Sequence, residues 1–357
     1  MLKVAIANDT LIALEILRRV IETDPYYELL WTAKNGAEAI ALCQQQRPDI
    51  MLMDLLMPGI DGVAATRQIM AQSPCAILLV TGSVEGNTSK VFEAMGQGAL
   101  DVVGTPKVGL QSDNLAAAAL PLLTKMDTVS AYIGKPVRGR FSRATRQQTS
   151  RLPKAPELIV IGASTGGPKA IAEVLRALPA HHSAAIVVVQ HLDAQFVPGF
   201  VQWLDGQVKL PVSLVRAGDQ PSSGTVMIAD GAQHLSIDAN CTFRYHSRSG
   251  HPDDVLQNSE AAANQQFIYC PSVDIFFQSV ARYWPNPGKA VLLTGMGADG
   301  AAGMSHLQTA GWHTIAQSEA SCAVYGMPKA AIARGAAKQI LSLSKIARIL
   351  QDSSNYS

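Results

Sequence analysis

Three side chains in the C-terminal half of the sequence have the types needed for nucleophilic catalysis. Ser164 lies in Gly162-Ala163-Ser164-Thr165-Gly166, and this glycine spacing is that of a nucleophile elbow, the tight strand-to-helix turn that exposes a serine hydroxyl. His191 and Asp299 each follow another apolar run, so a base and a carboxylate that orients it are both available. Free N–H groups at the helix start beside Ser164 would stabilise an oxyanion. The pattern favours acyl transfer through Ser164.

Other interpretations of these residues stay open on the sequence alone. Ser164 can also cap a helix or belong to a phosphate-binding loop, whereas a dinucleotide fingerprint needs glycine where Ser164 stands, which leaves NAD binding a weak alternative. His234, at the start of a short strand-like run, is the only competitor of His191. The chain order Ser, His, Asp differs from the Ser, Asp, His of α/β-hydrolases. The remaining histidines lie in loops or helical segments: His181, His182, His246, His251, His306 and His313.

A second group of polar residues follows the apolar runs of the N-terminal third. Asp9 comes after the first run, while Asp54 and Thr81 end the third and fourth. In a doubly wound sheet of strand order 2-1-3-4-5, the ends of the first and third strands flank one crevice, so both carboxylates are expected there. They favour a hard cation such as Mg²⁺, with Asp54 as a nucleophile toward a phosphoryl group and Thr81 as a hydrogen-bond donor to it. Helix capping by both aspartates is about equally compatible with the spacing.

The N-terminal residues 1–126 alternate between short apolar runs and segments of helical period. Five such units predict a five-stranded, doubly wound parallel α/β domain. The expected strands are Leu2–Ala7, Leu29–Ala33, Ile50–Asp54, Ala76–Thr81 and Leu100–Val103, and the expected helices lie near 11–22, 36–46, 62–71 and 88–97, with a fifth after Asp113.

Residues 127–156 differ in composition and are predicted to form an interdomain linker. Seven basic residues and no acid follow Asp127, mixed with Ser, Thr, Gln, Gly and Pro. A basic tract can bind nucleic acid, but charges diluted over about twenty residues are more typical of a solvated hinge.

A second alternating pattern fills residues 157–350 and predicts another doubly wound, Rossmann-like α/β domain. Ser164, His191 and Asp299 would each lie past the carboxyl end of a different parallel strand, at one edge of the sheet. The middle of the domain, about 205–255, is rich in glycine and short strand-like runs, so an antiparallel portion is expected there. The expected elements are strands Glu157–Gly162, Ala185–Gln190 and Lys289–Thr294, helices Lys169–Ala177, Ser272–Arg282 and Gly300–Thr309, and short strands Val212–Val215, Thr225–Ala229 and Thr242–His246.

The composition of the 357 residues excludes several classes of protein. Charged residues make up 16%, against roughly 25% in an average soluble protein, and 48% are hydrophobic, which favours buried parallel sheets. A net charge of +1 provides no field for a nucleic acid or an anionic membrane, and no apolar stretch reaches the roughly 18 residues of a membrane span. Five cysteines without a C-x-x-C pair argue against a disulfide framework or a zinc site. We therefore expect a cytoplasmic protein that neither binds nucleic acid nor inserts into a membrane.

Residues 1–126 resemble the receiver domain of response regulators. The resemblance implies that Asp54 accepts a phosphoryl group from a histidine kinase, and that Asp9, Asp54 and the backbone carbonyl of Leu56 hold Mg²⁺. Two positions depart from the family, because Asn8 replaces a usual acid and Thr105 replaces the usual lysine, with Lys107 displaced past the proline. These changes should weaken Mg²⁺ binding and remove a direct partner of the phosphoryl group. The motifs are Asp9, Asp54 with Met57-Pro58-Gly59 and Asp61-Gly62, Thr81, Gly98-Ala99-Leu100-Asp101 and Thr105-Pro106.

Residues 157–350 resemble the catalytic domain of the CheB chemotaxis methylesterases. The resemblance implies hydrolysis of glutamyl γ-methyl esters on the cytoplasmic domains of methyl-accepting chemoreceptors, releasing methanol, often with deamidation of receptor glutamines. The Asn8 and Thr105 departures are closer to the Wsp-type branch of surface-sensing arrays, and Tyr269-Cys270 stands where the family often has His-Arg. The motifs are Ile161-Gly162-Ala163-Ser164-Thr165-Gly166-Gly167-Pro168, Gln190-His191, Pro271-Ser272-Val273-Asp274, Leu293 through Met304, and Tyr325-Gly326-Met327-Pro328.

The resulting hypothesis is a serine esterase controlled by phosphorylation of its receiver. His191 takes the proton of Ser164, Asp299 stabilises the imidazolium, and backbone N–H groups near Thr165 and Met296 hold the oxyanion, so the esterase itself needs no cofactor. The alternative from another class is a non-catalytic adaptor that binds a kinase through its receiver and a receptor through its second domain. A transcriptional regulator is disfavoured because nothing after the linker has the pattern of a helix-turn-helix.

Overall fold

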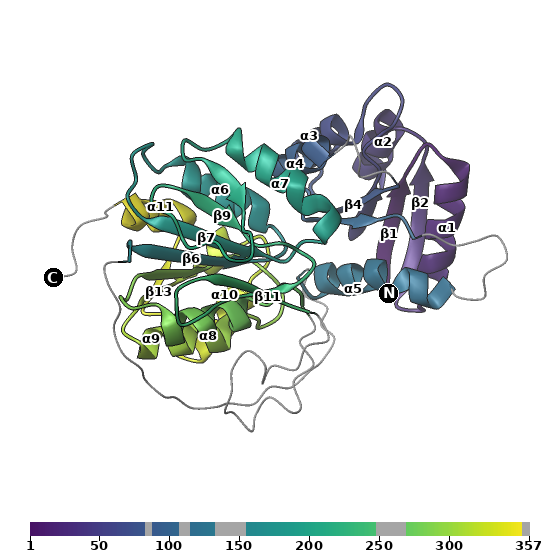
Figure 1. The fold of residues 1–357 in the computed structure, drawn as a ribbon. Helices are drawn as coiled ribbons and strands as arrows, with labels where there is room; N and C mark the ends of the chain where they lie inside the picture. Colours follow the sequence, from purple (N-terminus) through teal and green to yellow (C-terminus); the bar gives the residue numbers. More distant parts are fainter. Residues whose placement is uncertain (83–87, 107–114, 133–154, 248–268, 352–357) are drawn as a thin grey trace. The chain divides into compact units, whose positions relative to one another are not determined.

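The computed structural model describes residues 1–82, 88–106, 115–132, 155–247 and 269–351 of the chain (Figure 1). The chain forms two compact units, Met1–Gly139 and Arg140–Ser357. Each unit contains its own parallel sheet with helices on both faces.

The N-terminal unit is a doubly wound sheet of five parallel strands in the order β2-β1-β3-β4-β5. Its central strands β3 and β4 are continuous apolar runs that are buried on both sides, as expected where helices cover both faces of a sheet. Helices α1 and α5 contact each other, as do α2 with α3 and α3 with α4, so the helices form two layers. The elements are β1 (Leu2–Ala7), α1 (Leu11–Glu22), β2 (Tyr27–Ala33), α2 (Gly36–Gln45), β3 (Ile50–Met53), α3 (Gly62–Gln72), β4 (Ala76–Thr81), α4 (Thr88–Gln97), β5 (Asp101–Gly104) and α5 (Leu115–Tyr132).

The second unit contains a sheet of seven strands, all paired in parallel, in the order β14-β13-β12-β6-β7-β9-β8. Strands β10 and β11 form a separate antiparallel pair. The elements of the first half are β6 (Leu158–Ala163), α6 (Gly167–Arg176), β7 (Ala185–Gln190), the 3₁₀-helix η1 (Ala194–Phe196), α7 (Val197–Asp205), β8 (Val212–Leu214), β9 (Val226–Ile228), β10 (His234–Ile237) and β11 (Phe243–His246). Those of the second half are α8 (Val273–Tyr283), β12 (Lys289–Leu292), α9 (Ala301–Thr309), β13 (His313–Gln317), η4 (Glu319–Ser321), α10 (Met327–Ala333), β14 (Gln339–Leu341) and α11 (Leu343–Gln351).

Helices α8, α9 and α10 pack together on one side of the seven-stranded sheet, and α6 and α11 pack together on the other (Figure 1). The core between the sheet and the first group contains Phe276, Phe277 and Trp312, all nearly inaccessible to solvent. Burial of such side chains contributes roughly 1.5–3 kcal/mol each. The central strands β6, β7 and β12 are thereby fixed, and their carboxyl ends lie at one edge of the sheet.

The predicted fold class is confirmed for both halves of the chain. Among the described residues of the second unit the antiparallel portion consists of β10 and β11, because β8 and β9 pair in parallel within the large sheet. The boundaries 1–126, 127–156 and 157–350 stay predictions. Helix α5 continues to Tyr132, and most of the basic tract lies outside the described residues.

Candidate active site

Ser164 is the first residue after β6, in a turn whose backbone is held from three directions. Its N–H donates to the carbonyl of Thr294 at 3.0 Å, and its carbonyl accepts from the N–H of Gly167 at 2.7 Å and from the Gln190 side-chain amide at 2.9 Å. Gly166 has a φ of +76°, the left-handed conformation that favours glycine, which allows the chain to turn directly into α6. Ser164 itself is 7% exposed. These hydrogen bonds fix the backbone that carries the Ser164 hydroxyl.

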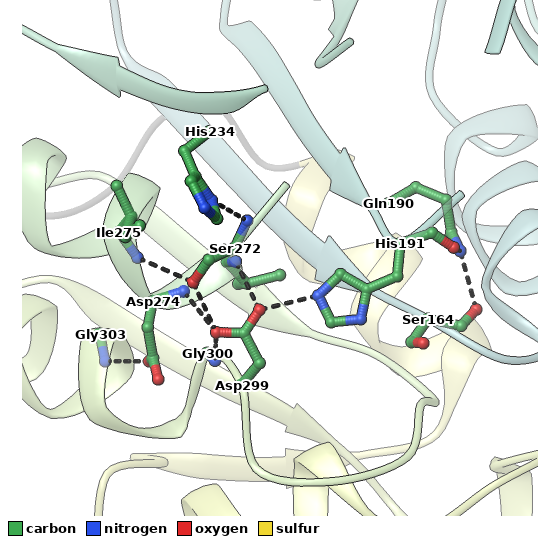
Figure 2. A network of polar contacts seen from close by, with 11 residues as sticks. Ser164, Gln190, His191, His234, Ser272, Asp274, Ile275, Asp299, Gly300 and Gly303 are labelled. Carbon is green, nitrogen blue, oxygen red and sulfur yellow. Dashed lines mark hydrogen bonds and ion pairs between the residues drawn. The ribbon is translucent and has the colours of Figure 1, made fainter. Parts of the chain in front are cut away.

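His191 lies beside Ser164 because it follows the neighbouring strand by one residue. Strand β7 pairs with β6 so that Gln190 is opposite Ala163, and the N–H of His191 donates to the Ala163 carbonyl at 3.0 Å. Figure 2 shows the imidazole between Ser164 on one side and Asp299 on the other. Parallel register thus brings the predicted nucleophile and base together.

Asp299 lies in the turn before α9 and accepts five hydrogen bonds with its two carboxylate oxygens (Figure 2). Its Oδ2 accepts from His191 Nε2 at 2.7 Å and from the Val273 N–H at 2.7 Å. Its Oδ1 accepts from Ser272 Oγ at 2.9 Å, the Asp274 N–H at 3.0 Å and the Gly300 N–H at 3.1 Å. Three of these donors belong to the start of α8, where the helix dipole favours a negative charge.

The charge on Asp299 persists although the carboxylate is 8% exposed. Burial alone would raise its pKa, but the hydrogen bond and charge of His191 and the N–H groups of Asp274 and Val273 hold this pKa below its ordinary value. Asp299 is therefore an ionised acceptor that can orient the imidazole and stabilise its protonated form.

The bond to Asp299 also sets the tautomer of His191. Because a carboxylate can only accept, Nε2 must carry the proton in neutral imidazole, which leaves a lone pair on Nδ1. Nδ1 is buried and has no hydrogen-bond partner among the residues that the structure describes. In Figure 2 this nitrogen is on the side of the ring where Ser164 lies. Nδ1 is thus the candidate base, a detail that the sequence did not indicate.

Asp299 and Asp274 cap each other's helices, because each carboxyl accepts an N–H from the first turn of the helix that is next to the other. Asp299 accepts from the first turn of α8, while Asp274, in that same turn, accepts from the N–H of Gly303 in α9 at 2.6 Å. Burial and the negative charge of Asp299 raise the pKa of Asp274 well above its ordinary value, so Asp274 holds a proton more tightly than Asp299 does. Opposite shifts of the two pKa values are expected where two carboxyls share a buried site, because two negative charges there would repel each other.

Gly295 allows the 295–300 turn to approach Ser164. A Cβ at this position would lie 2.7 Å from Ser164 Cβ and 2.3 Å from the sulfur of Met327. The turn is fixed from behind, because the Gly295 carbonyl accepts from the N–H groups of Gly326 and Met327. Met296, predicted as an oxyanion support, directly follows this contact, and Thr165, the other predicted support, directly follows Ser164.

Four residues support the site without being among its predicted members. Gln190 and Thr294 hold the backbone of Ser164, and Ser272 and Asp274 hold Asp299 and the helix after it. All four lie in the motifs that resemble CheB enzymes, so the motifs were the one feature of the sequence that could have identified them. His234, the competitor for the role of base, instead accepts the N–H of Ser272 on its Nδ1 at 3.1 Å. It supports α8 rather than Ser164.

The N-terminal unit brings Asp9 and Asp54 to one edge of its sheet. The Asp54 N–H donates to the carbonyl of Ala7, and Asp54 Oδ1 accepts from the Leu55 N–H at 2.7 Å. Burial, with a smaller contribution from the charge of Asp9, raises the pKa of Asp54 to about 6, against the lowering effect of the Leu55 and Leu56 N–H groups. A divalent cation would relieve this accumulation of negative charge, and the oxygens of Asp9, Asp54 and Leu56 are the donors Mg²⁺ prefers.

The positions that depart from receivers have other contacts here. Asn8 is buried, and its side-chain oxygen accepts from the Thr10 N–H at 2.8 Å, so it caps the turn before α1. The Thr105 N–H donates to the carbonyl of Thr81, which keeps these two residues at the same sheet edge as Asp54. Lys107 lies outside the described residues. No cluster of three or more His, Cys, Asp or Glu suited to a metal occurs within the part of the chain that is described.

Comparison with known proteins follows the division seen in the fold. Residues 159–350 match the CheB methylesterase family, and residues 4–108 match the response regulator receiver domain. The chain belongs to the CheB methylesterase family. It is 47% identical to protein-glutamate methylesterase/protein-glutamine glutaminase 3 of Pseudomonas aeruginosa, over 97% of this chain and 98% of that protein. It is 45% identical to a protein-glutamate methylesterase/protein-glutamine glutaminase of Mesorhizobium japonicum, over 98% of both.

A solved structure is similar to part of this chain. The catalytic domain of Thermotoga maritima CheB methylesterase is 30% identical, with a TM-score of 0.49, and covers 56% of this chain and 100% of that one. None of the helices among the described residues has the length and apolar character needed to cross a membrane.

Proposed function

We propose that this chain hydrolyses γ-methyl esters of glutamyl residues in methyl-accepting chemoreceptors and releases methanol. The observation that supports the proposal most strongly is the polar series from Ser164 through His191 to Asp299, in which an ionised carboxylate fixes an imidazole beside a serine. Relatives that match almost the whole chain are named for this reaction.

In the first half of the reaction Ser164 forms an acyl-enzyme. Its Oγ attacks the ester carbonyl while its proton passes to Nδ1 of His191, and the imidazolium is stabilised by Asp299 through Nε2. The N–H groups of Thr165 and Met296 hold the negative oxygen of the tetrahedral intermediate. The intermediate collapses when His191 returns the proton to the leaving methoxide, and methanol departs.

In the second half water replaces methanol. Nδ1 accepts a proton from the attacking water, the tetrahedral intermediate forms again, and the same proton restores the Ser164 hydroxyl as the glutamate is released. A glutamine side chain would react by the same steps with ammonia as the leaving group. We therefore include deamidation of receptor glutamines in the proposal.

The test is methanol release from methylated receptor by the full chain and by single variants. We expect Ser164→Ala and His191→Ala to abolish release while the far-UV spectrum and Tm stay near those of the parent chain. Ser213→Ala is the matched control, because Ser213 is exposed on β8. Near-normal turnover by Ser164→Ala would refute the assignment of the nucleophile. Labelling of Ser164 by a fluorophosphonate separates an esterase from a non-catalytic adaptor.

We further propose that a histidine kinase phosphorylates Asp54 and that this controls the esterase. Asp9, Asp54 and the Leu56 carbonyl would hold Mg²⁺, which would screen the negative charges as the phosphoryl group approaches, and Thr81 would donate to a phosphoryl oxygen. An unphosphorylated receiver would inhibit the catalytic domain, and the added charge at Asp54 would relieve inhibition. The comparison is the esterase rate with and without acetyl phosphate and Mg²⁺, using Asp54→Asn as control. Equal esterase rates with and without acetyl phosphate would refute regulation of the esterase by the receiver. Since the substrate domains of chemoreceptors are cytoplasmic, the cytoplasm is the proposed location.

A further inference from the structure

The ring of Tyr269 lies directly against the candidate base. Its plane is within 6° of the His191 imidazole, and the two ring centroids are 4.7 Å apart. Tyr269 begins the segment that leads into Ser272 and the first turn of α8, where Asp299 is held. A single short stretch of chain therefore contacts both the base and the group that orients it.

Tyr269 also contacts the turn that precedes Asp299. Gly297, with a φ of +81°, lies so close that a Cβ there would be 3.2 Å from the phenolic oxygen of Tyr269. The aromatic side chain is thus packed between the imidazole and the 295–300 turn. The Tyr269 ring covers one face of the His191 imidazole. At the edge of the imidazole, Nε2 hydrogen-bonds to Asp299 and Nδ1 is on the side where Ser164 lies.

We propose that Tyr269 is a positioning residue that holds the plane of His191 and stabilises the imidazolium formed during acyl transfer. The proposal rests on the function proposed above, because it requires His191 to act as the base. Stacking restricts rotation of the imidazole about its Cβ–Cγ bond, and that rotation would carry Nε2 away from Asp299 and Nδ1 away from Ser164. An aromatic face near a cation also attracts it electrostatically.

The chemistry of the site favours a neutral aromatic ring at this position. Burial and the negative charge of Asp299 raise the pKa of the Tyr269 phenol, so the ring remains uncharged at neutral pH. In the proposed mechanism His191 gains a positive charge when it accepts the proton of Ser164. The interaction with the ring is consequently stronger in the transition state than in the resting enzyme, and its loss should lower kcat more than it changes KM.

The experiment compares variants that keep or remove the ring. Tyr269→Phe keeps the ring and loses the hydroxyl, whereas Tyr269→Leu and Tyr269→Met lose the ring and keep an apolar side chain. Tyr283→Leu is the matched control, since Tyr283 is a partly buried tyrosine at the far end of α8. The measurements are kcat and KM for methanol release, the rate constant for fluorophosphonate labelling of Ser164, and the ¹⁵N NMR signals that report which imidazole nitrogen of His191 is protonated.

We expect Tyr269→Leu and Tyr269→Met to lower kcat and the labelling rate by about tenfold, with KM changed less than twofold, as a desolvated cation–π contact predicts. Tyr269→Phe and Tyr283→Leu should stay within about twofold of the parent chain. In the variants without the ring, the ¹⁵N signals should show a smaller fraction of His191 protonated on Nε2 and a larger fraction protonated on Nδ1. Two non-aromatic variants are used so that one that fails to fold does not decide the result.

Three results would overturn the role of Tyr269. These are unchanged labelling rates in both non-aromatic variants, an effect confined to KM, and a Tyr269→Phe variant as impaired as Tyr269→Leu. Failure of the proposed function has a different signature, because the parent chain itself would then release no methanol from the receptor. Labelling does not depend on the receptor, so it tests Tyr269 even where the receptor substrate is wrong.

Discussion

Replacing Asp299 with asparagine changes one oxygen of the carboxylate to an NH₂ group and so tests the orientation of the base. Oδ1 accepts three hydrogen bonds and Oδ2 accepts two. The amide should therefore keep its oxygen at the Oδ1 position and place NH₂ at the Oδ2 position, against the Val273 N–H and His191 Nε2. An NH₂ group donates, so Nε2 must become the acceptor, and the imidazole proton moves to Nδ1. Nδ1 can then no longer take the proton of Ser164.

The size of the effect follows from this change of tautomer. In serine proteases the equivalent substitution preserves the geometry and lowers kcat about 10⁴-fold for the same reason. That factor corresponds to roughly 5.5 kcal/mol of lost transition-state stabilisation. The Val273 N–H also loses its acceptor, which costs about 1–3 kcal/mol of folding stability. We therefore expect a folded protein of lower Tm whose kcat falls by about four orders of magnitude.

Asp274→Asn is the matched control for Asp299→Asn. Asp274 is the neighbouring buried carboxyl, and burial and the charge of Asp299 raise its pKa, so its neutral form is favoured and a neutral amide resembles that form. Its side-chain oxygen accepts from the Gly303 N–H, and an amide oxygen can do the same. This variant should retain kcat within about threefold. Both variants are measured by methanol release, by fluorophosphonate labelling and by thermal unfolding.

Two outcomes would contradict the argument. Asp299→Asn with more than a tenth of the parent kcat would mean that the tautomer of His191 is not set by Asp299. Equal losses in Asp299→Asn and Asp274→Asn would mean that the two carboxyls act as one unit, contrary to the opposite shifts of their pKa values.

Further predictions concern the receiver carboxylates and the approach of the 295–300 turn. The pKa of Asp54 is raised to about 6, so the folded state binds its proton more tightly than the unfolded state does, and this group destabilises the fold increasingly as pH rises from about 4 to 6. Without Mg²⁺, Asp54→Asn should therefore have a higher Tm than the parent chain, by an amount that grows from about pH 4 to 6 and levels off above pH 6. Added Mg²⁺ should stabilise only the parent chain. A difference in Tm between the two proteins that does not depend on pH would disprove this prediction. Gly295→Ala should lower the labelling rate of Ser164 about 100-fold, because the new Cβ would lie 2.7 Å from Ser164 Cβ, and a misplacement of about 1 Å has this cost. Gly206→Ala, whose Cβ would meet nothing closer than 3.5 Å, is the control, and equal rates in the two variants would exclude the steric argument.

Most of both sheets could be predicted because their central strands are continuous apolar runs between helical segments. Strand β6, for example, is buried along its whole length, as its sequence indicates. Strand β14 has three residues and is largely exposed at the sheet edge, so it lacks that signal. The first residues of α7, Val197-Pro198-Gly199, obscure its helical pattern. Helix α11 did have a detectable signal, since Leu343, Ile346, Ala347 and Leu350 are spaced to form one buried face.

The positions of the site residues were more predictable than their hydrogen bonds. Ser164 and His191 each follow a strand by one residue, so parallel pairing implies that they are neighbours. The support of Asp299 by the start of α8 joins residues more than 20 apart in the chain, and no local spacing indicates such a contact. The stacking of Tyr269 on His191 is likewise tertiary, and its motif departs from the family where the contact occurs.

The register of β6 and β7 also explains why Nδ1 of His191, rather than Nε2, is on the side of the ring where Ser164 lies. Ser164 and His191 occupy corresponding positions on adjacent strands, joined by the bond from the His191 N–H to the Ala163 carbonyl. The serine is therefore near the main chain of His191, and Nδ1 is the ring nitrogen nearer to that main chain. Nε2, at the outer end of the ring, reaches Asp299 in the turn after β12. Because Ser164 follows the strand next to that of His191 and Asp299 lies at the outer end of the imidazole, Nδ1 faces Ser164 and Nε2 binds Asp299. Moving the carboxylate should therefore impair His191 as a base even where Ser164 stays in place.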